Sequence, residues 1–87
     1  MRVIIVGREF SDYNREVREF KREFEDRTGA EVEEIDPDSP EGISFCEARD
    51  IVQYPTVVVS DDDGSKVMAE FKGTPLPMLD EVAAYLG

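Results

Sequence analysis

Hydrophobic and charged positions alternate in short blocks, and the first two blocks predict a strand followed by a helix. The run Arg2–Val6 is rich in β-branched residues and ends at Gly7, which is typical of a strand in a sheet covered on both faces. From Ser11 to Thr28 the apolar residues recur at spacings of four, three and four, at Tyr13, Val17, Phe20 and Phe24. Charged residues fill most of the positions between them, so this segment is predicted to be an amphipathic helix.

Polar and small residues mark the ends of this helix and of the next strand. Ser11 or Asp12 is suited to cap the first turn by accepting backbone N–H bonds. Gly29 follows at a position where a left-handed C-terminal cap is common. The segment Ala30–Ile35 has a weaker strand pattern, and it ends before Pro37, which removes a ladder donor.

The middle of the chain predicts a short helix and a central strand. Ser39 and Pro40 are typical of an N-cap followed by proline in the first helical turn. The helix is predicted to reach about Asp50. After Pro55 the strongly β-branched run Thr56–Val59 indicates a central strand.

A hairpin and a last helix complete the pattern. The acidic triplet Asp61–Asp63 with Gly64 has the residues typical of a turn. A calcium loop is the less favoured interpretation, because the triplet lacks the spaced oxygen ligands of such a loop. We therefore expect Lys66–Lys72 to return as an antiparallel partner. Beyond Gly73, an apolar stripe within Met78–Leu86 predicts the last helix.

Together these elements predict the order β-α-β-α-β-β-α in a single domain spanning residues 1–87. Right-handed crossovers would bring the first and last helices against the same sheet. The expected architecture is an α/β three-layer sandwich around a mixed four-stranded sheet. A chain of this length buries roughly 60 to 65% of its unfolded surface, which is enough for one core and too little for two.

Acidic residues dominate the charge of the chain, with 21 acids against 10 bases and a formal net charge of −11. Nucleic acids and anionic lipid surfaces are bound through basic patches, which this sequence does not supply. We therefore expect no nucleic-acid partner and no membrane partner. A solvated surface is the simplest interpretation of the charge, and a basic partner is the alternative.

Hydropathy and cysteine content favour a cytoplasmic protein. The longest apolar stretch is Val3–Val6, far shorter than the ~20 residues of a membrane helix. No secretory signal pattern precedes the first strand. The single Cys46 cannot form an internal disulfide or a cysteine-based zinc site, and we expect no metal and no cofactor.

Two segments resemble the thioredoxin and glutaredoxin superfamily. Tyr54-Pro55-Thr56, within the stretch IVQYPTVVV, is similar to the family's approach to its third strand, and DGSKVMAEFKG, which ends at Gly73, is similar to its hairpin. Small bacterial proteins of this superfamily are the nearest likeness. The resemblance implies the thioredoxin fold, a cis bond before Pro55, and exposure of the Tyr54 backbone to a bound extended peptide.

The same resemblance exposes a departure from the family. Its C-x-x-C motif would fall between the first strand and the first helix, where Ser11 and Asn14 stand in place of the two sulfurs. No cysteine precedes Cys46, and the chain contains no histidine that could activate a serine. We therefore predict that the protein is not a dithiol oxidoreductase and, by extension, not an enzyme.

Three hypotheses for function follow. The first is a non-redox domain that binds a protein or peptide at the cis-proline edge through Tyr54, Pro55 and Thr56, with Ser11, Tyr13 and Asn14 as a polar docking edge. In the competing structural interpretation, Ser11 caps the helix and Tyr54 packs over the first helix.

The second hypothesis is a single-thiol redox or glutathione-linked protein using Cys46, which is otherwise a half-buried core residue. The third is a homo-oligomeric subunit that buries the Tyr54 surface. The sequence leaves the oligomeric state open.

Overall fold

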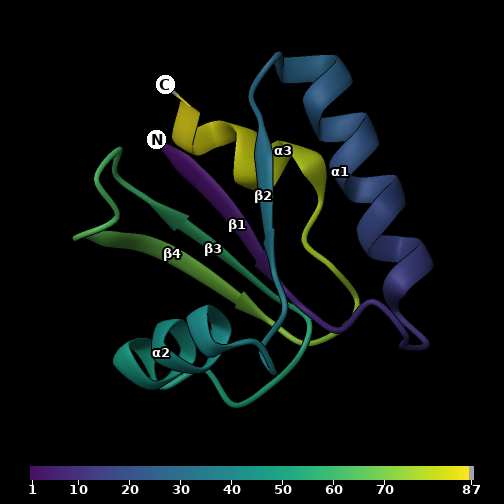
Figure 1. The fold of residues 1–87 in the computed structure, drawn as a ribbon. Helices are drawn as coiled ribbons and strands as arrows, with labels where there is room; N and C mark the ends of the chain where they lie inside the picture. Colours follow the sequence, from purple (N-terminus) through teal and green to yellow (C-terminus); the bar gives the residue numbers. More distant parts are fainter. Residues whose placement is uncertain (87) are drawn as a thin grey trace.

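A mixed sheet of four strands forms the centre of the molecule in the computed structural model, which describes residues 1–86 (Figure 1). The strand order is β2-β1-β3-β4, with β1 parallel to β2 and antiparallel to β3, which in turn is antiparallel to β4. The strands are β1 (Arg2–Val6), β2 (Val32–Ile35), β3 (Thr56–Ser60) and β4 (Val67–Lys72). The predicted element order and the mixed sheet are confirmed.

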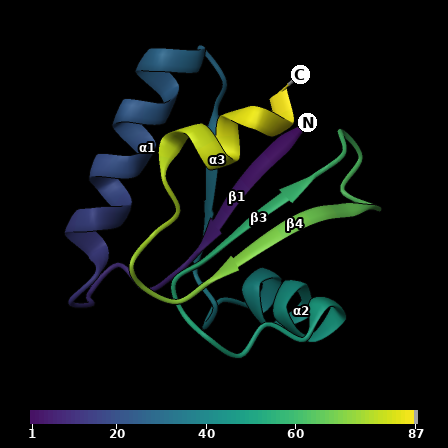
Figure 2. The same cartoon turned by 180° about the vertical axis from the view of Figure 1, so that it is seen from behind.

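Helices cover both faces of the sheet, which completes the three layers (Figures 1 and 2). One face carries α1 (Asn14–Thr28) and α3 (Leu79–Ala83), and α3 continues into a short 3-10 helix over Ala84–Leu86. The other face carries α2 (Pro40–Arg49). None of the helices within residues 1–86 has the length and apolar character needed to cross a membrane.

The alternation of side chains along the buried strands divides the core into two clusters. Val3 and Ile5 of β1 point toward α1 and α3, where they pack with Phe24, which is completely buried. Ile4 and Val6 point toward α2 and pack with Cys46. Because β1 and β3 are covered on both faces, their sequences are continuous apolar runs without polar alternation.

The start of α1 differs from its prediction. The helix begins at Asn14, and the residue before it, Tyr13, makes no side-chain capping bond. Ser11 does not cap the helix, because α1 begins three residues later with Tyr13 at the N-cap position. The Ser11 hydroxyl donates to the carbonyl of Arg8 at 2.7 Å. The expected C-terminal cap at Gly29 is confirmed, with a φ of 74°.

Several smaller boundaries were predicted closely. The Ser39 hydroxyl accepts from the N–H of Gly42 at 2.9 Å, which confirms the N-cap of α2. The acidic turn closes the β3–β4 hairpin, where the Asp61 carboxylate accepts from the N–H of Lys66 at 3.2 Å. The last helix is shorter than expected, because α3 ends at Ala83.

Candidate functional site

The loop after β1 and the segment before β3 meet at one end of the sheet, around Gly7. A Cβ at Gly7 would lie 3.0 Å from the Tyr13 ring and 3.7 Å from the Cβ of Pro55. The Gly7 N–H donates to the carbonyl of Ile35, the last residue of β2, at 3.1 Å. The absence of a side chain at Gly7 therefore lets the predicted residues of the two segments come together.

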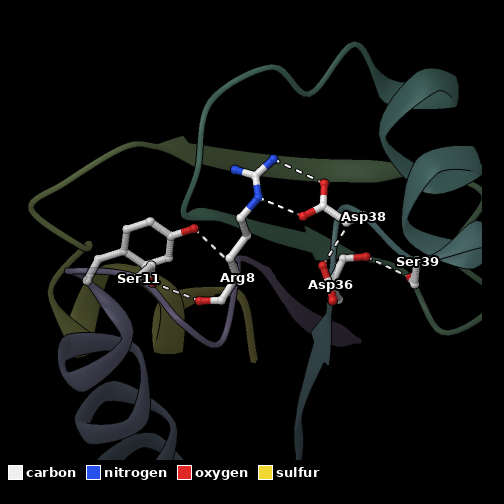
Figure 3. A network of polar contacts seen from close by, with 6 residues as sticks. Arg8, Ser11, Asp36, Asp38 and Ser39 are labelled. Carbon is white, nitrogen blue, oxygen red and sulfur yellow. Dashed lines mark hydrogen bonds and ion pairs between the residues drawn. The ribbon is translucent and has the colours of Figure 1, made fainter.

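The β1–α1 loop is held by hydrogen bonds to the backbone of Arg8 (Figure 3). The Arg8 N–H donates to the Tyr13 hydroxyl at 2.9 Å, and the Ser11 hydroxyl donates to the Arg8 carbonyl at 2.7 Å. The N–H of Asn14 donates to the Ser11 carbonyl at 3.3 Å, which closes the turn into α1. Ser11 and Tyr13 thus define the shape of this loop.

An ion pair connects the loop to the start of α2 (Figure 3). The Arg8 guanidinium donates to both carboxylate oxygens of Asp38, at 2.8 and 3.2 Å. These hydrogen bonds hold the pKa of Asp38 below, and that of Arg8 above, their ordinary values. The backbone N–H of Asp38 donates to the Asp36 carboxylate at 2.9 Å. Asp38 is therefore held at its carboxylate by Arg8 and at its backbone by Asp36.

Tyr54 lies under the Arg8 guanidinium, which is 4.8 Å from the centre of its ring. The ring packs against the core cluster that contains Cys46, on the α2 face of the sheet, and not over the first helix as the structural interpretation had it. Burial raises the pKa of Tyr54, and the nearby Cys46 thiol raises it further. Tyr54 is half-buried.

Pro55 and Thr56 are buried and serve the fold. The Tyr54–Pro55 peptide bond is cis. The Pro55 carbonyl accepts from the N–H of Gly73 at 2.8 Å, and the Thr56 hydroxyl donates to the carbonyl of Gln53 at 2.6 Å. Neither side chain is exposed to a partner, so within this segment only Tyr54 can supply side-chain contacts from the predicted set.

Two hollows flank this end of the sheet. One, of about 320 Å³, is lined by Gly7, Tyr13 and Asn14 together with the end of β2. The other, of about 370 Å³, is lined by Tyr54, Cys46 and the exposed Val52. Arg8 lines the first hollow and covers the Tyr54 ring at the edge of the second. Of the predicted residues, Tyr13 and Asn14 line the first hollow and Tyr54 and Cys46 the second, whereas Ser11, Pro55 and Thr56 line neither.

Comparison of the sequence with models of known protein families, and with curated proteins, finds no match. The structure does match a solved one. Thioredoxin 1 from the thermophilic eubacterium Thermosipho africanus TCF52B superposes with a TM-score of 0.74 over 99% of this chain and 94% of that one, at 15% sequence identity. The chain has the thioredoxin fold. At this identity the likeness extends to the fold alone.

The two polar residues that the sequence resemblance placed at the family's sulfur positions lie in the β1–α1 loop and at the start of α1. Ser11 uses its hydroxyl proton to bond the Arg8 carbonyl. Asn14 is the first residue of α1 and is half-buried against the first hollow. With one cysteine in the chain, no dithiol can form at any position.

Cys46 is more buried than the sequence suggested. Its side chain is 7% exposed, and it packs among Ile4, Val6 and Ile51 with Tyr54 beside it. Small apolar surroundings of this kind suit a structural thiol. Within residues 1–86 there is also no group of three or more acidic, cysteine or histidine side chains arranged to hold a metal ion.

Two residues of the β1–α1 loop were not singled out from the sequence. Phe10 is 94% exposed in the β1–α1 loop, and Arg8 joins the two hollows. A usable signal existed for Phe10, because this aromatic residue belongs to neither the strand run Arg2–Val6 nor the apolar stripe of the helix. Aromatic side chains are enriched at protein interfaces. Arg8 carried no comparable signal.

Proposed function

We propose that this thioredoxin-fold domain binds an extended segment of a protein partner alongside Tyr54, with no redox chemistry and no cofactor. The observation that carries the proposal concerns the main chain of Tyr54. Among residues 1–86, its peptide N–H and C=O make no hydrogen bond with another residue. Backbone polar groups that the fold leaves available can pair with an incoming strand.

Side chains around Tyr54 supply the contacts that would give specificity. Arg8 presents a guanidinium above the ring, and Phe10 offers an exposed aromatic surface on the neighbouring loop. Aromatic residues and arginine are enriched where interfaces carry most of their binding energy. The hydrogen bonds of Ser11 and Tyr13 hold this loop in shape before binding, which lowers the entropic cost of association.

The single-thiol alternative is not favoured by any contact of Cys46. A reactive thiol needs access and a positive environment, whereas Cys46 is 7% exposed and lies among apolar side chains.

A cytoplasmic location and the absence of nucleic-acid partners remain our expectations from the cysteine content and the net charge.

The proposal is tested by selecting random displayed peptides on the immobilised chain and titrating the best binder into isotope-labelled protein. We expect the amide signal of Tyr54 to shift and its hydrogen exchange to slow, because its N–H becomes paired. Tyr54→Ala should weaken binding more than Tyr85→Ala, a matched change at a half-exposed tyrosine of the C-terminal 3-10 helix. Equal weakening by both variants, or shifts confined to other surfaces, would reject the proposal.

A further inference from the structure

A groove separate from the two hollows lies on the side of α1 that faces away from the candidate site. It has a volume of about 450 Å³ and runs between α1 and the connection from β4 to α3. This connection passes beside α1 in both views (Figures 1 and 2). Glu16, Phe20 and Glu23 line the groove, whereas Asn14 and Arg18 line the first hollow. At 3.6 residues per turn these two sets lie on opposite faces of α1.

The floor of the groove is apolar and partly uncovered. Phe20 is buried at its base, and Leu76 and Leu79 pack against the same core cluster while remaining half-buried. Met78 is 73% exposed at the edge, on a backbone fixed by the bond from its N–H to the Glu81 carboxylate at 3.1 Å. A flexible thioether above an apolar floor is a surface that adapts well to apolar side chains of a partner.

The rim of the groove is acidic. Glu16, Glu19 and Glu23 line it from α1, and Asp80 lines it from α3. Among the residues within 1–86 that line the groove, the one basic side chain is Arg27, which lies 3.7 Å from Asp80. The lining therefore carries four negative charges and one positive charge, a net of −3.

We propose that this groove docks a basic amphipathic segment of another protein. An apolar side chain of the segment would enter above Phe20 beside Met78, and flanking lysine or arginine side chains would reach the carboxylates of the rim. The charge of the groove disfavours nucleic acid and anionic lipid, whose phosphates it would repel. A second copy of this chain is disfavoured as well, because each copy carries a net charge of −11.

This inference is independent of the proposed function, because none of the groove residues contributes to the Tyr54 surface. Binding at the groove and at Tyr54 can therefore succeed or fail separately. The groove, with its acidic rim, is the surface that fits the basic partner that the net charge left open.

The test uses the whole chain labelled at its methionine methyl groups, with a synthetic amphipathic lysine–leucine peptide as the probe at physiological ionic strength. We expect the Met78 methyl signal to shift saturably. The Met68 methyl signal should stay in place, because this residue is also exposed but lies on β4 away from the groove. The same peptide with glutamate in place of lysine should not bind.

Matched charge variants distinguish peptide binding at the groove from general electrostatic attraction to an acidic protein. The double variant Glu16→Gln with Glu23→Gln should lower the affinity for the peptide about fivefold, since each exposed ion pair contributes modestly. Glu47→Gln with Glu70→Gln changes the net charge equally on other exposed surfaces and should have a much smaller effect. An unmoved Met78 signal, or equal weakening by the two pairs, would overturn the proposal.

Discussion

Replacing Gly42 with alanine should destabilise the protein, although alanine is the better helix former. Gly42 lies in the first turn of α2, buried against the end of β2. A Cβ at this position would overlap the Asp36 carbonyl oxygen, and it would lie 2.7 Å from the Asp36 carbonyl carbon and 3.0 Å from the Cα of Pro37. All three atoms belong to the backbone, so no side-chain rotation can relieve the overlap.

The size of the effect follows from two opposing contributions. Alanine gains about 1 kcal/mol of helix propensity over glycine. Overpacking in a close-packed region costs typically about 1–3 kcal/mol, and a clash with backbone belongs in the upper part of that range. We therefore expect Gly42→Ala to lower the free energy of unfolding by about 1–2 kcal/mol, a large fraction for a domain of this size.

Urea denaturation followed by circular dichroism measures this change, with Ala48→Gly as the control. Ala48 is exposed on the same helix, so Ala48→Gly should lose only the propensity of about 1 kcal/mol. A chemical-shift change at Asp38 is expected in Gly42→Ala, because displacing Asp36 and Pro37 would also move Asp38, the ion-pair partner of Arg8. If Gly42→Ala were as stable as the wild type, the close packing of α2 on Asp36 would be refuted.

Three further predictions concern the candidate site. Tyr13→Phe removes the hydroxyl that accepts from the Arg8 N–H and should lower the free energy of unfolding in urea by about 0.5–1.5 kcal/mol; an unchanged value would mean that water replaces the hydroxyl. Arg8→Ala should raise the pKa of Asp38 toward its ordinary value of 3.8, as measured by carboxyl NMR titration. In the wild type this pair stabilises the fold above that pH and loses its effect as the pH falls through the lowered pKa of Asp38, so acid should destabilise the wild type more steeply than the variant. Cys46 should react with iodoacetamide in urea and far more slowly in native protein, because it is 7% exposed; rapid native alkylation would restore the single-thiol hypothesis.

Local sequence signals predicted the elements that they determine. The spacing of Val17, Phe20 and Phe24 located α1, because one face of a helix must be apolar to reach the core. Ser39 and Gly29 marked helix ends, because their capping depends on their own side chain or φ angle. Such signals act over a few residues and so remain visible in a single sequence.

Features that depend on distant segments were not visible. Ser11 has the right chemistry for an N-cap, but the path of the loop starts α1 three residues later, at Asn14. The role of Arg8 depends on Asp38, thirty residues away, which reaches it only once β2 has paired with β1. Tyr54 could have packed on either face of the sheet, because its segment precedes the strand and has no alternation of its own.

The contacts around Arg8 hold the loop at this end of the sheet in a shape that fits our proposal of partner recognition. Here the Ser11 hydroxyl proton is bonded to the Arg8 carbonyl, the Tyr13 hydroxyl accepts from the Arg8 N–H, and the Arg8 side chain is held by Asp38. These three contacts are used to hold the loop. On our proposal, these bonds hold the loop in shape before a partner arrives, and the Phe10 ring and the Tyr54 main chain are the groups that an incoming segment contacts.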